Sequence, residues 1–231
     1  VPALIFRTLR LIRWRRPDGV LVPPDVFIPI AEQSHLIVQI GKWVLEQACR
    51  DLAMLRRAGF QDLRVHVNMA ASEFTSSSLP EELRTLVSAF DLAPRSLSLE
   101  LTEGMLMKRP DQVIPVMRSL RQLGFEISLD DFGMGHSSLS LLKNLPISSM
   151  KIDRSFVRDL PQQHNDRAIM KTIVDLGRHM QLDVIAEGVE TASQLDVLQQ
   201  AGCTLIQGFL LSRPLALGDL LSQYPGGQWR H

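Results

Sequence analysis

Short apolar runs alternate with longer amphipathic runs along most of the chain. The short runs are typical of strands, and the longer runs repeat apolar residues every three or four positions, as helices do. The pattern predicts strands at residues 4–13, 63–68, 96–101, 126–130, 149–152, 183–186 and 205–208. It predicts helices between them at residues 36–57, 83–90, 113–123, 139–145, 168–180 and 193–201.

The alternation of strand and helix predicts a parallel sheet, covered on both faces because its strands are short and apolar. The predicted strands are one fewer than a closed (β/α)8 barrel has, and the missing strand would precede Val1. We therefore expect an α/β fold of the TIM-barrel type that lacks its first strand. The alternative, an open doubly wound sheet, needs a glycine-rich turn that the sequence lacks. Because the chain begins at Val1 rather than Met, we expect it to be part of a longer polypeptide.

Composition and charge exclude some classes of protein. Of 231 residues, 45% are hydrophobic and 22% charged, which is ordinary for a globular domain. The 25 basic and 25 acidic residues give a formal net charge of zero, which disfavours a DNA-binding or membrane-surface protein, since both need a basic excess. Two cysteines, Cys49 and Cys203, fit buried thiols in the cytoplasm. No apolar run is long enough to span a membrane, although a longer protein could be membrane-attached.

Polar residues follow one after another at or near the carboxyl ends of the predicted strands. They are Asn68, Glu100, Asp130 with Asp131, Lys151, Glu187 and Gln207. A single such residue would more often be a turn or cap residue. Six successive strands with polar residues at matching positions instead predict one shared site, because the carboxyl ends of barrel strands surround the same opening.

The chemistry of this set indicates a hard divalent cation. Four carboxylates in one opening repel each other unless a cation lies among them. The donors are oxygens without sulfur or imidazole, which favours Mg²⁺ or Mn²⁺, and a lysine beside them suits phosphoryl chemistry. The histidines have no ligand spacing, and we expect His66 and His179 to be packing or surface residues.

Longer motifs occur in a fixed order along the chain. They include Phe27-Ile28-Pro29, Ile40-Gly41-Lys42-Trp43, Glu100-Leu101-Thr102-Glu103, Asp130-Asp131-Phe132-Gly133, Lys151-Ile152-Asp153-Arg154, Ala186-Glu187-Gly188-Val189 and Gln207-Gly208-Phe209. Through these motifs the chain resembles the EAL domain of bacterial cyclic di-GMP phosphodiesterases. The resemblance covers nearly the whole chain, so we expect an EAL domain over residues 1–224 and a short tail over residues 225–231.

The resemblance implies a modified TIM barrel whose first strand is antiparallel, and hydrolysis of cyclic di-GMP to pGpG with two Mg²⁺ or Mn²⁺ ions. The resemblance implies metal ligands at Asn68, Glu100 and Asp130, and a role at the second metal for Asp131. It implies that Lys151 holds a water or a phosphate oxygen and that Glu187 is the general base. It further implies a loop anchor at Glu103 and substrate contacts from Arg13, Gln207 and Phe209. It also implies a homodimer through the face near residues 131–138, and an upstream GGDEF or sensory domain is common in the family.

The chain departs from the family pattern at a metal ligand. The Glu-Ala-Leu triplet that names the family reads Leu9-Arg10-Leu11 here, and residues 1–17 contain no acidic residue. Leucine has no lone pair, so one ligand is lost at Leu9. Met134 and His136 also replace the usual threonine and tyrosine of the loop that follows Asp131.

Three functions remain open from the sequence. The first is a domain that binds cyclic di-GMP with weak or no hydrolysis, which the lost ligand favours. The second is an active phosphodiesterase, because loss of one ligand need not abolish turnover. The third is a protein-interaction module that binds no nucleotide, since function depends on sites rather than folds.

Overall fold

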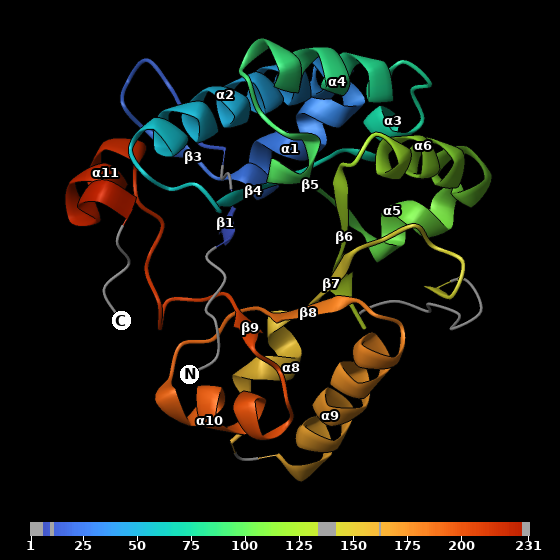
Figure 1. Cartoon of the computed structure of the whole chain (residues 1–231), viewed down its shortest axis with the longest axis vertical. Coiled ribbons are helices and arrows are strands. Elements are labelled where there is room, and N and C mark those ends of the chain that lie inside the picture. Colours follow the sequence, from blue (N-terminus) through green and yellow to red (C-terminus); the bar gives the residue numbers. More distant parts are fainter. Residues whose placement is uncertain (1–6, 10–11, 134–141, 162, 228–231) are drawn as a thin grey trace.

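The computed structural model describes residues 7–9, 12–133, 142–161 and 163–227. Its main element is a seven-stranded parallel sheet with the order β1-β4-β5-β6-β7-β8-β9 (Figure 1). The strands are β1 (Arg7–Leu9), β4 (Arg64–Asn68), β5 (Leu97–Thr102), β6 (Glu126–Phe132), β7 (Ser149–Ile152), β8 (Asp183–Ala186) and β9 (Leu205–Ile206). A separate antiparallel hairpin pairs β2 (Trp14–Arg15) with β3 (Leu21–Val22). All seven predicted strands and their parallel pairing are therefore confirmed.

Helices lie around the curved sheet, with α2 and α4 at one end of the view and α9 and α10 at the other (Figure 1). Their bounds are α1 (Pro24–Gln33), α2 (Ile37–Arg57), α3 (Ala71–Phe74), α4 (Leu79–Ala89), α5 (Glu103–Lys108), α6 (Pro110–Gln122), α8 (Arg154–Arg158), α9 (His164–His179), α10 (Ala192–Gln200) and α11 (Leu217–Gln223), with 3₁₀ turns at Pro94–Ser96 and Pro225–Gly227. Residues 139–141 of the predicted helix at residues 139–145 lie outside the described residues. The α/β barrel of the predicted type is confirmed, with β1 and β9 as the two ends of the strand order.

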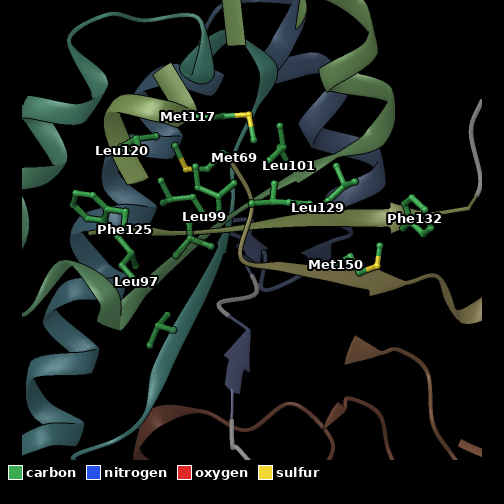
Figure 2. Packing of buried hydrophobic residues seen from close by; sticks show 14 of the residues in the cluster. Met69, Leu97, Leu99, Leu101, Met117, Leu120, Phe125, Leu129, Phe132 and Met150 are labelled. Atoms are coloured by element: carbon green, nitrogen blue, oxygen red, sulfur yellow. The ribbon is translucent and has the colours of Figure 1, made fainter. Parts of the chain in front are cut away.

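The sheet packs its outer face against the helices. Leu97, Leu99 and Leu101 alternate along β5 and meet Met117 and Leu120 of α6 in a continuous core (Figure 2). All five side chains are at most 2% exposed. Successive residues of a strand point to opposite faces, so the residues between these leucines belong to the inner face.

The inner face of the central strands is polar, contrary to the prediction of apolar strands. Its buried members are Ser98 and Glu100 in β5, Ser128 and Asp130 in β6, and Ser149 and Lys151 in β7. The apolar residues between them, Leu99, Leu129 and Met150, gave the strands their apolar appearance in the sequence. The polar residues instead follow the two-residue strand period and line the inside of the barrel.

The two cysteines are buried, as predicted. Cys49 is fully covered and Cys203 is 1% exposed. Burial raises the pKa of the Cys49 thiol to about 12 and that of Cys203 to about 11, so both stay protonated at neutral pH. Across the described segments, none of the helices combines the length and the apolar character that crossing a membrane requires.

A buried carboxylate lies where α3 meets α2. Glu73 is 7% exposed, and its Oε2 accepts a hydrogen bond from the backbone N–H of Ala70 at 2.7 Å. The carboxyl group lies directly against Gly41 of α2, where any side chain would collide with it. Burial raises the pKa of Glu73 to about 7, although the bond from Ala70 opposes the shift.

Because Glu73 holds its proton more tightly in the folded state, we expect the free energy of unfolding to fall as the pH rises from about 4.5 to about 7. The shift from 4.5 to about 7 corresponds to a loss of about 3 kcal/mol. Urea unfolding of the wild-type chain and of Glu73→Gln at pH values across this range measures it. The variant should gain stability relative to the wild type as the pH rises. A constant difference between the two curves would contradict the prediction.

Candidate active site

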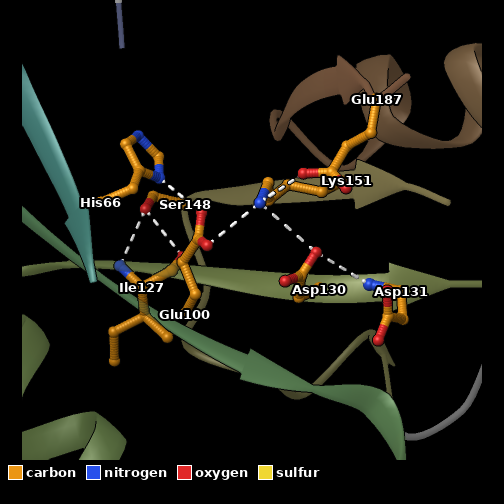
Figure 3. Close-up of polar contacts among 8 residues, drawn as sticks. All are labelled: His66, Glu100, Ile127, Asp130, Asp131, Ser148, Lys151 and Glu187. Atoms are coloured by element: carbon orange, nitrogen blue, oxygen red, sulfur yellow. Dashed lines mark hydrogen bonds and ion pairs between the residues drawn. The ribbon is translucent and has the colours of Figure 1, made fainter. Parts of the chain in front are cut away.

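The ammonium group of Lys151 is the centre of a buried charge cluster. Its Nζ lies 2.5 Å from Glu187 Oε1, 3.0 Å from Glu100 Oε2 and 3.5 Å from Asp130 Oδ1 (Figure 3). These residues come from β7, β5, β6 and the residue after β8, and Lys151 is only 1% exposed. Four residues predicted from the strand ends therefore meet at one point. The carboxylates raise the pKa of Lys151 more than burial lowers it, so the lysine stays charged.

Glu100 is the most deeply buried carboxylate of the cluster. Burial alone would raise its pKa, but the hydrogen bond from His66 and the charge of Lys151 outweigh burial and lower it. The Nδ1 atom of His66 lies 2.7 Å from Glu100 Oε1 and donates to it, because an ionised carboxylate can only accept. Glu100 is therefore held as an anion between two nitrogen donors.

His66 is a site residue that the sequence analysis did not recognise. It was expected to be a packing or surface residue, and it is indeed 3% exposed, but it bonds directly to Glu100. The signal that could have found it is its spacing from Asn68. The two residues are two positions apart in β4 and so share the face that carries the site. His179, in contrast, is exposed as expected.

Asp130 and Asp131 occupy an irregular part of β6. The register between β6 and β7 shifts between Leu129 and Phe132, and Asp131 has a left-handed backbone with φ of 54°. Its N–H donates to Asp130 Oδ1 at 3.0 Å. Burial raises the pKa of Asp130 to about 7, against the charge of Lys151, and burial together with the charge of Asp153 raises that of Asp131. The irregularity lets two successive aspartates border the same cluster.

The cluster carries more negative than positive charge. Its four carboxylates, Glu100, Asp130, Asp131 and Glu187, face one lysine, which leaves three negative charges when all are ionised and His66 is neutral. This excess and the all-oxygen donor set fit a hard divalent cation. Within the described residues, however, no three His, Cys, Asp or Glu side chains are already gathered around one metal position.

Glu103, the predicted loop anchor, lies at the start of α5 and is 2% exposed. Its Oε2 accepts a hydrogen bond from the N–H of Gly133 at 3.3 Å. This contact joins the start of α5 to Gly133, and the anchor role of Glu103 stays a prediction. The replaced loop residues Met134 and His136 lie outside the described residues, as does most of the face expected to form a dimer.

Four other predicted site residues, Asn68, Gln207, Arg13 and Phe209, form no hydrogen bond or ion pair with the Lys151 cluster in the described part of the chain. Asn68 is exposed at the end of β4, and Gln207 is half-buried beside β8, where its N–H donates to Ala186 O at 2.8 Å. Arg13 is exposed and donates to the carbonyl of its neighbour Ile12. Phe209 is 50% exposed, and the guanidinium carbon of Arg213 lies 4.7 Å from its ring centre. Their roles stay predictions.

Leu9, where the sequence analysis predicts that a metal ligand is lost, lies in β1. β1 pairs in parallel with β4, and Leu9 is the register partner of His66. His66 bonds to Glu100. The backbone of Leu9 therefore lies on the strand next to the one that carries His66.

Comparison with known proteins agrees with the geometry. The family model of the EAL domain matches residues 7–214. The chain is 46% identical over 210 residues to the Cyclic di-GMP phosphodiesterase NbdA of Pseudomonas aeruginosa, covering 91% of this chain and 27% of that protein. Among solved structures, the PaMucR phosphodiesterase in its c-di-GMP complex is 42% identical with a TM-score of 0.87, covering 92% of this chain and 86% of that one. The FimX EAL domain of Pseudomonas aeruginosa bound to c-di-GMP is 28% identical with a TM-score of 0.85, covering 92% and 86%.

Proposed function

The chain belongs to the EAL domain family, and on that basis we propose that it binds cyclic di-GMP at the Lys151 cluster and hydrolyses it weakly or not at all. The observation that carries this proposal is Leu9, which stands beside the His66–Glu100 pair where the family pattern has a glutamate. The remaining acidic cluster supports binding, and the missing carboxylate weakens catalysis. The chain spans only 27% of the length of NbdA, so the proposal concerns this domain alone.

The residues of the cluster have distinct parts in this proposal. Asn68, Glu100, Asp130 and Asp131 would hold the divalent ions. When bound, such ions polarise the phosphate and lower the pKa of water. Lys151, which contacts three carboxylates, would supply the positive charge that holds a phosphate oxygen or a water. Burial raises the pKa of Glu187, which brings it closer to that of a general base working near neutral pH.

A working phosphodiesterase is the second candidate. It is favoured by the contacts of Lys151 with Glu100, Asp130 and Glu187, which bring together the groups that the family is expected to use. In this case Leu9 would lower the rate without abolishing it. The two candidates differ in turnover and not in binding, so both quantities must be measured on the same preparation.

Equilibrium dialysis with labelled cyclic di-GMP, followed by chromatography of pGpG in the presence of Mn²⁺, tests the proposal. We expect the domain to retain the nucleotide and to form pGpG at least about a hundredfold more slowly than the EAL domain of NbdA in the same assay. Mutation of a group that only hydrogen-bonds to a metal ligand typically lowers metal affinity or activity by about 10–100-fold, and loss of a direct ligand should cost more. The variant Glu187→Gln should remove any residual turnover and leave binding. Turnover equal to that of NbdA would favour the second candidate. Absence of retention would leave the interaction module.

A further inference from the structure

A groove lies between α2, α3 and α4, which are neighbours on one side of the barrel (Figure 1). Its volume is about 460 Å³, within the range of sites that take small organic molecules. Its apolar wall comes from Val38, Leu45, Leu79, Leu83 and Leu86. None of its lining residues belongs to the Lys151 cluster, so the groove is a separate feature of the domain.

The charges on the rim of the groove compensate each other. Lys42 Nζ lies 2.9 Å from Oε2 of Glu82. The other carboxylate oxygen of Glu82, Oε1, accepts a hydrogen bond from the hydroxyl of Ser78 at 2.6 Å. Glu46 Oε1 is paired with Arg50 at 2.6 Å. The rim acids therefore already have cationic partners, and a ligand would gain little by pairing with them.

Glu73 is the exception among the acids that line the groove. It is more than nine-tenths buried, and none of the ion pairs found in the described part of the chain involves it. Its Oε2 is used by the N–H of Ala70, whereas Oε1, which lies against Gly41, has no hydrogen bond among the described residues. One carboxylate oxygen is thus available in a groove whose other acids already have cationic partners.

We propose that this groove binds a small organic monocation with an apolar body, whose ammonium group pairs with Glu73 while the body lies against the leucines. A charge-assisted hydrogen bond to a buried carboxylate is stronger than one at the surface. The cation would also reduce the cost of burying Glu73, because its charge favours the ionised carboxylate that burial disfavours.

The shape of the groove favours a small molecule over a protein partner. Leu45, Leu79 and Leu83 are at most 6% exposed, so the apolar floor is reached only from within the groove. Val38, at 37%, is more exposed than these three leucines. A docked helix needs a broad apolar face, which these residues do not present.

Titration of the whole chain with naphthylmethylamine, followed by amide proton–nitrogen NMR, tests the proposal, with the neutral naphthylmethanol as matched probe. We expect saturable shifts at residues of α2, α3 and α4 that are stronger for the amine. Glu73→Gln keeps an acceptor for Ala70 but removes the charge, and it should weaken amine binding at least about tenfold while changing alcohol binding less than about twofold. Glu32→Gln, at an exposed site on α1, should change neither.

Leu86→Trp provides a second variant, because it fills the groove without altering Glu73 and should weaken both probes. Circular dichroism verifies that each variant is folded, and if Glu73→Gln does not fold, Leu86→Trp alone decides. Equal binding of the amine to the wild-type chain and to Glu73→Gln would overturn the proposal, as would shifts confined to other elements or unchanged binding to a folded Leu86→Trp.

Discussion

Replacing Leu9 with glutamate is expected to raise the turnover of cyclic di-GMP by at least about a hundredfold and to strengthen Mn²⁺ binding. The position lies in β1 beside His66, which is bonded to Glu100. A carboxylate there adds a hard oxygen donor next to an existing one, and metal affinity rises with the number of charged ligands. Mutation of a group that only hydrogen-bonds to a metal ligand changes metal affinity or activity by about 10–100-fold, so the effect of a direct ligand should exceed this range.

Chromatography of pGpG measures the turnover, and calorimetric titration with Mn²⁺ measures the metal affinity without nucleotide. Leu9→Gln separates charge from shape, because its amide oxygen is a weaker ligand, and it should give a smaller gain. Leu21→Glu adds the same charge at an exposed leucine of β3 and should change neither quantity. If Leu9→Glu folds but gains neither affinity nor turnover, then Leu9 is not the defect, and the replaced loop residues Met134 and His136 become the cause to test.

The sequence contained enough information to predict the seven strands, because each is a short apolar run between helical segments. It also identified Lys151 and the three carboxylates that meet it, because strand ends in a parallel barrel share one opening. The short helices were missed for a local reason. α1 begins at a proline and contains Pro29, and α8 is only five residues long, so neither shows a clear helical period.

The contacts that give the site its properties depend on pairing between strands. The spacing from Asn68 could place His66 on the face that carries the site, but it could not identify Glu100 as its partner. His66 acquires its role because β4 lies next to β5, and the histidine itself has no ligand spacing in the sequence. The irregular backbone at Asp131 depends on the register shift between β6 and β7. The groove at Glu73 requires Gly41, a residue more than thirty positions earlier that leaves room for the carboxylate.

Replacing Lys151 with methionine is expected to lower the free energy of unfolding by about 3–5 kcal/mol, the range seen when one partner of a buried ion pair is removed. Methionine keeps much of the length of the side chain, so the loss reports the charge. Without the ammonium group, Glu100 stays buried with only His66 as a donor. Urea unfolding measures the loss, and Lys108→Met, at an exposed lysine of α5, should have little effect.

The dependence of stability on pH distinguishes this electrostatic cause from a packing defect. In the wild-type chain, the pKa of Glu100 is lowered on folding, so its contribution is present above its unfolded pKa and is lost as the pH falls. Once Lys151 is removed, burial is the largest influence on Glu100 and should raise its pKa. The difference in free energy of unfolding between the wild type and Lys151→Met should therefore be smaller at acidic pH than at neutral pH. Adding Glu100→Gln should recover part of the loss at neutral pH. A loss that does not change with pH and is not rescued by Glu100→Gln would show that Lys151 stabilises the barrel by packing instead of charge.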